Sequence, residues 1–186
     1  ERMMRGASVC CTDQDDERRP ARHAARGGLG AVMGAKGLKY VAVDAGKTGV
    51  RHGADKKAFM ALCKGMSKTY LGGPQPMQYG TSPSVDMAQM LHTFPYKNRV
   101  EGQSPDAATL TGTGIIASFE ERGGGMHNCM TGCIVSCSNV VHDVDGNYKT
   151  SALEFETLTL LGANCAVDTW DKVASLDRLC DEVGLD

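Results

Sequence analysis

The sequence lacks an apolar run long enough to cross a membrane, and no signal-peptide pattern opens it. Its net charge of −2 comes from acidic and basic residues interspersed along the chain, so nothing indicates binding to nucleic acid or to an anionic membrane. It also has no internal repeat and no low-complexity tract. Eight cysteines without a secretory signal indicate a reducing compartment, and we expect a cytoplasmic protein.

The length and composition are those of a globular protein. With 186 residues, of which 41% are apolar, the chain can bury one core or parts of two domains. It begins with Glu1 rather than Met and ends straight after a helix-like segment. We therefore expect a fragment of a longer polypeptide, inactive when expressed alone.

Hydrophobic periodicity and turn residues predict the secondary structure. Short strands are expected at residues 7–12 and 40–43, and a hairpin at 140–148 with its turn at Asp145-Gly146. Asp168 is expected to cap the last helix, which ends before Gly184. The pattern predicts further helices over residues 55–70, 84–91, 113–122 and 153–165.

Three cysteines that lie close together are the strongest chemical signal in the chain. Cys129, Cys133 and Cys137 fall within the run His127-Asn-Cys-Met-Thr-Gly-Cys-Ile-Val-Ser-Cys137. Three thiolates this close can converge on a soft metal centre, which is typical of iron–sulfur and zinc sites. Glycines before and inside the run favour a loop wrapped around a ligand.

Other interpretations of the triplet remain. A spacing of four residues can also place three thiols on one helix face for packing. Zinc bound with His127 or His142 as the fourth ligand is a further alternative, although the spacing is unusual for zinc. Disulfides are disfavoured, because nothing in the chain resembles a secreted framework. The five other cysteines are scattered and are interpreted as packing residues.

A glycine-rich segment, Arg26-Gly-Gly-Leu-Gly-Ala-Val-Met-Gly-Ala-Lys-Gly-Leu-Lys39, is the second signal. Its backbone amides and basic side chains suit a phosphate. The spacing fits neither a dinucleotide fingerprint nor a P-loop. Taken alone, the segment is explained equally well by tight packing of a loop.

In combination, these segments resemble the tungsten- or molybdenum-pterin aldehyde ferredoxin oxidoreductase family. The glycine-rich segment looks like that family's pterin-contacting loop, and the cysteine triplet falls about where its cluster loop does. Three more runs match in the same order: Phe94-Pro-Tyr-Lys-Asn98 with Gly102, Glu154-Phe-Glu-Thr-Leu158, and Asp181-Glu-Val-Gly-Leu-Asp186. One departure is that the family's C-x2-C-x3-C becomes C-x3-C-x3-C here, which suggests a branch away from the best-known archaeal enzymes.

The resemblance implies an α+β, mostly α fold. Residues 1–47 would end a β-rich pterin-binding domain, and residues 48–186 would begin a helical domain. In the family, the fourth cysteine of the cluster lies in a later part of the polypeptide, which would explain why only three are grouped here.

The resemblance also implies cofactors and the residues that hold them. Cys129, Cys133 and Cys137 would bind a 4Fe-4S cluster. A bis-pyranopterin carrying tungsten or molybdenum would be bound by two segments, with magnesium bridging the pterin phosphates near Gly27. The pterin-contacting residues would be Arg26, Gly27, Gly28, Leu29, Gly30, Asp181, Gly184, Leu185 and Asp186.

The implied reaction is oxidation of an aldehyde, or a related small carbonyl compound, to the acid. Electrons would leave through the cluster to a ferredoxin or an iron–sulfur partner subunit. Glu154 and Glu156 are the candidate general bases; a helix would turn them to different faces, and both could instead be structural. Two other functions compete with this one: a non-catalytic iron–sulfur electron-transfer module and a structural zinc-binding domain.

Overall fold

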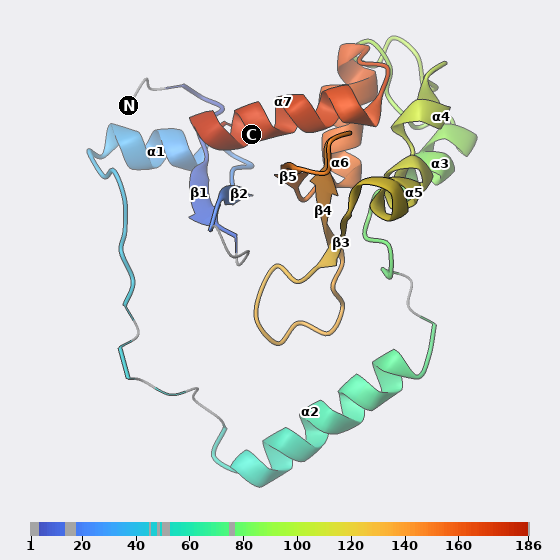
Figure 1. The fold of residues 1–186 in the computed structure, drawn as a ribbon. Helices are drawn as coiled ribbons and strands as arrows, with labels where there is room; N and C mark the ends of the chain where they lie inside the picture. Colours follow the sequence, from blue (N-terminus) through green and yellow to red (C-terminus); the bar gives the residue numbers. More distant parts are fainter. Residues whose placement is uncertain are drawn as a thin grey trace.

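The structure is a computed structural model that describes residues 4–13, 18–44, 46–47, 49, 53–74 and 77–185. Within these residues the chain forms two small antiparallel sheets and a larger set of helices (Figure 1). The fold class is therefore α+β and mostly α, which confirms the prediction from the sequence. None of the described helices is both long and apolar enough to span a membrane.

Each sheet is built from neighbouring antiparallel strands. The first is a hairpin of β1 (Val9–Thr12) and β2 (Pro20–Ala24). The second has β4 (Ser138–His142) at its centre, between β3 (Gly124–His127) and β5 (Tyr148–Ser151). β4 and β5 are joined at the predicted turn, so the hairpin expected there is confirmed.

Helices make up most of the remaining regular structure. In chain order they are α1 (Leu29–Ala35), α2 (Lys56–Leu71), α3 (Ser84–Met90), α4 (Ala107–Leu110), α5 (Gly112–Arg122), α6 (Phe155–Thr157) and α7 (Trp170–Val183). The helices predicted over residues 55–70, 84–91 and 113–122 are confirmed as α2, α3 and α5.

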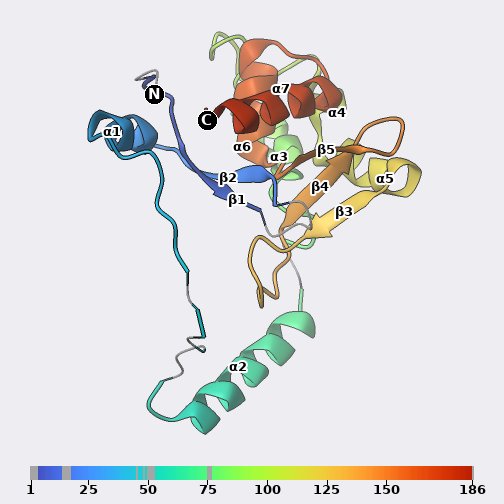
Figure 2. The same ribbon diagram turned by 60° about the vertical axis from the view of Figure 1, so that its left-hand side comes forward.

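Helix α2 lies apart from the other elements in both views (Figures 1 and 2). None of its residues is buried. Its start is fixed locally, because the Asp55 carboxylate accepts the backbone N–H of Ala58. Local capping and periodicity, rather than packing, therefore account for this helix.

Helix α7 packs against both sheets: it contacts β2 of the first and β5 of the second, and both strands lie below it in Figure 2. Its buried face includes Val173 and Ala174. Gly184 ends the helix in a left-handed conformation, with φ of 74°, as predicted. This placement brings the C-terminal end of the described chain against the N-terminal hairpin.

The N-terminal cap of α7 differs from the prediction. Thr169, not Asp168, caps the helix, because its hydroxyl oxygen accepts the backbone N–H of Lys172. The Asp168 carboxylate instead accepts hydrogen bonds from the Lys172 ammonium group, at 2.7 and 2.8 Å. The Asp168 carboxylate is occupied by this ion pair with Lys172, one turn along the helix, and Thr169 therefore caps α7 in its place.

The hydrophobic core lies where α3, α4, α5 and α7 meet the second sheet and the segment before α6. Its largest fully buried apolar side chains are Phe94, Leu110, Ile115, Leu153, Leu158, Val85, Val141 and Val173. The residues come from many elements, so the core fixes the positions of α6 and α7 relative to β4.

Two predictions about secondary structure are corrected. Residues 40–43 form no strand, and Tyr40, Val41 and Val43 are exposed. An apolar run forms a strand only where a partner strand satisfies its backbone, and none of the described strands pairs with these residues. The helix predicted over residues 153–165 is irregular: α6 is followed by a π-helical turn, Leu158–Gly162, and a 3₁₀ turn, Ala163–Cys165.

The side chain of Asn139 holds the chain that leads from β5 to α6. Its amide N–H donates to the Leu153 carbonyl, and its amide oxygen accepts the Leu153 N–H, both at 3.0 Å. Asn139 and Leu153 are almost fully buried. Asn139 therefore satisfies a backbone donor and a backbone acceptor that water cannot reach.

We predict that Asn139→Ala lowers the free energy of unfolding by about 2–4 kcal/mol, because two buried backbone groups lose their partners. Thermal unfolding of the purified protein measures the change. The exposed Asn147 in the β4–β5 turn provides a matched control, and Asn147→Ala should cost less than about 1 kcal/mol. Equal losses in the two variants would contradict the role given to Asn139.

Candidate functional site

Two adjoining cavities of about 340 and 310 Å³ lie between β2, α6 with the turn that follows it, and α7. They share six lining residues, which come from elements far apart in the sequence. These are His23, Arg26, Glu156, Thr157, Asp177 and Asp181. The shared lining carries several charges, so this region suits a polar, hydrogen-bonding ligand.

Asp181 is the most buried carboxylate of this lining, with 7% of the residue exposed. One oxygen, Oδ1, lies 2.9 Å from Nε2 of His23, and the guanidinium of Arg178 lies 3.6 Å from the other, Oδ2. Among the described residues, Oδ2 accepts no hydrogen bond. Because an ionised carboxylate can only accept, Oδ2, which is shielded from solvent, keeps an acceptor position that no described residue fills.

His23 is held from behind by the N-terminal segment. The Ser8 hydroxyl lies 2.5 Å from Nδ1 of His23 and also donates to the Gly184 carbonyl at 3.0 Å. The Ser8 backbone N–H donates to the same carbonyl. The segment before β1 therefore ties His23 on β2 to the end of α7.

The two predicted glutamates both reach the smaller cavity. Glu156 also lines the larger one, and its carboxylate lies 3.2 Å from the Arg26 guanidinium in an exposed ion pair. Glu154 accepts a hydrogen bond from the Thr81 hydroxyl at 2.5 Å. It precedes α6 in extended backbone, so the expectation that a helix turns the two carboxylates apart does not apply.

The glycine-rich segment forms a turn and then helix α1, rather than a loop throughout. Gly27 and Gly28 have φ of 94° and 75°. A Cβ atom at Gly30 would lie 2.4 Å from the Ala7 carbonyl oxygen, so this glycine is required for packing. Leu29 is half exposed. Of the predicted residues in this segment, only Arg26 lines the cavities.

The last predicted segment meets the same region. Leu185 lines the larger cavity and pairs with Ala7 in an isolated β-bridge. The Gly184 carbonyl is bound by Ser8, as described above. Asp186 lies outside the described residues. One cavity is thus bordered by three of the predicted residues, Arg26, Asp181 and Leu185, although the first and the last lie 159 positions apart in the sequence.

The three predicted cluster cysteines lie in the loop between β3 and β4, not along a helix, so the helix-face interpretation is wrong. The backbone N–H groups of Ser136 and Val135 lower the pKa of the Cys133 thiol. Burial raises the pKa of the Cys137 thiol, and the negative charges of Glu154 and Cys129 add to the effect.

All eight cysteines lie within the described ranges, and none of them forms a disulfide. Within the described ranges, no three Cys, His, Asp or Glu side chains converge closely enough to hold a metal ion. The histidines considered as zinc ligands are engaged elsewhere: Nε2 of His127 lies 2.8 Å from the Asp13 carboxylate, and Nδ1 of His142 lies 3.1 Å from the Arg122 carbonyl.

Comparison with known proteins agrees with this arrangement. Residues 1–45 match the family model of the aldehyde ferredoxin oxidoreductase N-terminal domain, and residues 61–186 match that of domains 2 and 3. The chain belongs to the aldehyde ferredoxin oxidoreductase family. This confirms the resemblance seen in the sequence.

Two relatives within the aldehyde ferredoxin oxidoreductase family are tungsten-containing aldehyde ferredoxin oxidoreductases. The protein from Pyrococcus furiosus is 33% identical over 170 residues, and that from Thermococcus kodakarensis is 31% identical over 170 residues. Each alignment covers 89% of this chain but 27% of the relative. The chain thus spans about a quarter of the length of the curated relatives it matches.

Sequence reasoning missed Asp177, which lies outside the segments that carry the resemblance to the aldehyde ferredoxin oxidoreductase family. It stands one helical turn before Asp181, so the i, i+4 spacing was a signal that could have found it. The Thr150 hydroxyl donates to its carboxylate at 2.6 Å. Burial raises the pKa of Asp177 to about 7; the charge of Asp181 adds to this, and Arg178 and His23 oppose it.

Because the folded pKa of Asp177 lies above the unfolded value of 3.8, its proton stabilises the fold at low pH. That stability is fully present below pH 3.8 and is lost as the pH rises through about 7. We predict that Asp177→Asn removes most of the loss between pH 5 and pH 8, on the order of 2–4 kcal/mol.

Melting temperatures of the wild type and the Asp177→Asn variant at pH 5 and pH 8 measure this effect. Asp168→Asn is the matched control, because the hydrogen bond with Lys172 lowers the pKa of Asp168 and the group is ionised at both pH values. If the wild type and Asp177→Asn lose the same stability between these pH values, Asp177 does not titrate there.

Proposed function

We propose that this chain is the central part of an oxidoreductase that oxidises an aldehyde, or a related small carbonyl compound, to the acid. Residues 1–47 end its N-terminal domain, and residues 48–186 begin the helical domain. The observation that carries the proposal is the cavity in which Arg26 and the incompletely satisfied Asp181 carboxylate meet. The names of the relatives support this reaction class.

A bis-pyranopterin that carries tungsten or molybdenum is the proposed cofactor of this cavity. The residues fit such a group, because Asp181 lines the cavity and its Oδ2 accepts no hydrogen bond within the described chain, so a rotation of this buried side chain would present Oδ2 to a pterin N–H. The Arg26 side chain is 84% exposed at the rim, where a phosphate can reach it. Backbone groups from Gly27 to Gly30, next to Arg26 in the chain, would hold the phosphates together with magnesium, and Gly184, Leu185 and Asp186 would contact the pterin.

A 4Fe-4S cluster is the proposed ligand of Cys129, Cys133 and Cys137. The three thiols share one loop, and the charges of Cys129 and Cys133 raise the pKa of the Cys137 thiol, so the three lie within electrostatic reach of one another. Because no three ligand side chains converge among the described residues, the loop would have to close around the cluster. The positions of His127 and His142 argue against zinc at this loop. A fourth cysteine from a later part of the polypeptide would complete the set.

A bound metal–pterin would supply a two-electron acceptor for oxidation of the hydrated aldehyde, and the cluster would supply one-electron transfer toward a ferredoxin-like acceptor. The role of this chain is to position the cofactor and move a proton. Glu156 is the stronger candidate for the general base, because it lines both cavities and its ion pair with Arg26 is exposed. The carboxylate of Glu154 is already bonded to the Thr81 hydroxyl.

Metal analysis of the complete polypeptide, purified without oxygen, tests the proposal. We expect tungsten or molybdenum together with iron, and viologen-linked oxidation of aldehydes. Iron alone, without turnover, would replace the proposal with an electron-transfer module. Zinc alone would replace it with a structural zinc-binding domain.

We predict that Asp181→Asn lowers retention of tungsten or molybdenum and pterin about tenfold or more. The amide loses the charge that strengthens the hydrogen bond from a pterin N–H, and such bonds contribute roughly 1.5–3 kcal/mol. Metal and pterin content per polypeptide after gel filtration measure the change. Asp168→Asn, at an exposed ion pair, is the control and should retain both cofactors. Full cofactor content in Asp181→Asn would exclude Asp181 as a pterin ligand.

A further inference from the structure

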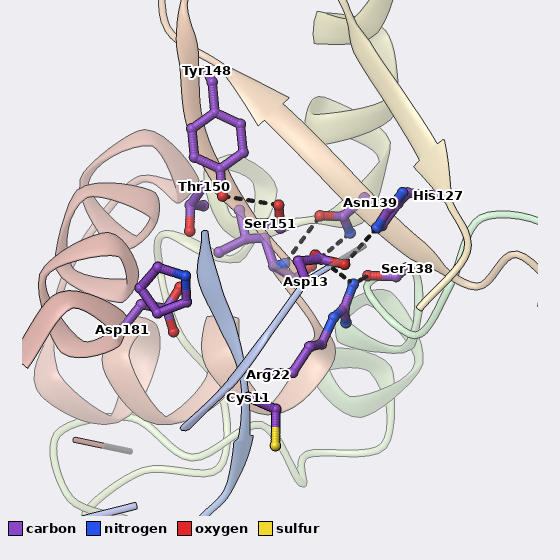
Figure 3. A network of polar contacts seen from close by, with 12 residues as sticks. Cys11, Asp13, Arg22, His127, Ser138, Asn139, Tyr148, Thr150, Ser151 and Asp181 are labelled. Atoms are coloured by element: carbon purple, nitrogen blue, oxygen red, sulfur yellow. Dashed lines mark hydrogen bonds and ion pairs between the residues drawn. The ribbon is translucent and has the colours of Figure 1, made fainter. Parts of the chain in front are cut away.

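Asp13 is a buried carboxylate that contacts two cationic or donor side chains from different sheets (Figure 3). Its side chain is fully buried. One oxygen, Oδ1, lies 2.8 Å from Nε2 of His127, the last residue of β3. The other, Oδ2, accepts a hydrogen bond from the Arg22 guanidinium on β2 at 3.2 Å.

Besides Asp13, Arg22 also contacts the second sheet. The same guanidinium nitrogen donates to the Ser138 hydroxyl at 2.7 Å. Ser138 is the first residue of β4, and it lies directly opposite His127 in the register of β3 and β4. Asp13, Arg22, His127 and Ser138 therefore form a closed ring, here called the neck ring, that joins the hairpin to the second sheet (Figure 3).

The neck ring lies at the base of the loop that carries the three cysteines. The cysteine loop begins directly after His127 and ends directly before Ser138. Cys129 follows His127 by two residues, and Cys137 adjoins Ser138. The neck ring thus holds both stems of the loop that carries the three thiols, while the loop itself projects beyond the sheet (Figure 1).

The same hairpin also forms part of the cofactor cavity. His23 follows Arg22 on β2, and successive side chains of a strand point to opposite faces. The Arg22 guanidinium bonds Ser138, whereas the His23 imidazole lies against Asp181 in the cavity. Adjacent residues of one strand thus connect the cysteine loop and the cavity, so a shift of β2 moves both.

We propose that Asp13 is a positioning residue for electron transfer: it orients His127 and Arg22 so that the cysteine loop keeps a fixed place relative to the cofactor cavity. This rests on the proposed function, since it requires the cluster to occupy the loop. Asp13 lines neither of the two cavities. It acts by holding two partly buried donors, and charge-assisted bonds of this kind fix side-chain geometry more firmly than neutral ones.

The test uses the complete polypeptide, purified without oxygen, in the variants Asp13→Asn, His127→Leu and His127→Gln. The midpoint reduction potential and the electron paramagnetic resonance spectrum of the reduced cluster are measured per mole of iron. We expect Asp13→Asn and His127→Leu to shift both properties in the same direction. His127→Gln should restore them toward the wild type, because a glutamine amide N–H can occupy the place of Nε2 and donate to Asp13.

The matched control is Asp168→Asn, the same chemical change at an exposed ion pair, which should leave potential and spectrum unchanged. If Asp13→Asn does not fold, the inference is tested by the potentials and spectra of the two His127 variants: His127→Leu should differ from the wild type, and His127→Gln should lie closer to it. Wild-type potential and spectrum in Asp13→Asn and His127→Leu, at wild-type iron content, would overturn this inference alone. A wild-type protein purified without iron would instead overturn the proposed function, so failure of the proposed function can be told apart from failure of this inference.

Discussion

The packing of α7 against both β2 and β5 is the contact on which the rest of the structure depends. It brings the two sheets together, and it places Asp181 against His23. Burying charged groups is costly unless partners are supplied, and the hairpin provides them. Without this contact, the cavity would lose one wall and the neck ring would lose its hairpin side.

Much of the fold follows from local patterns. Helices α2, α3 and α5 have clear periodicity and starts, and the β4–β5 turn is marked by Asp145-Gly146, so these could be predicted. Residues 40–43 could not, because their strand propensity is not matched by a neighbouring strand. The cap of α7 also escaped prediction, since Asp168 and Thr169 are both good caps and an ion pair with Lys172 decides between them.

The site was predictable only where a motif marks it. The family resemblance predicted Arg26 and Asp181, which the structure places at one cavity, because each lies within a recognisable run. The cysteine triplet, predicted in the same way, stays a prediction. Asp177 and the neck ring were not found, because their importance arises from burial and from contacts between elements more than a hundred residues apart. A pattern in the sequence indicates which residue types are present, whereas their desolvation depends on tertiary packing.

The π-helical turn Leu158–Gly162 has a consequence for how the larger cavity tolerates change. Glu156 and Thr157 line that cavity before the turn, and Leu160 and Leu161 line it within the turn. Such a turn holds one residue more than an α-helical turn. Deleting one residue would return this turn to α-helical geometry and leave the residues on either side nearly in register, whereas the same deletion in a regular α-helix would rotate everything beyond it by about 100°. The wall of the cavity can therefore lose one residue here at a smaller structural cost than an ordinary helix could.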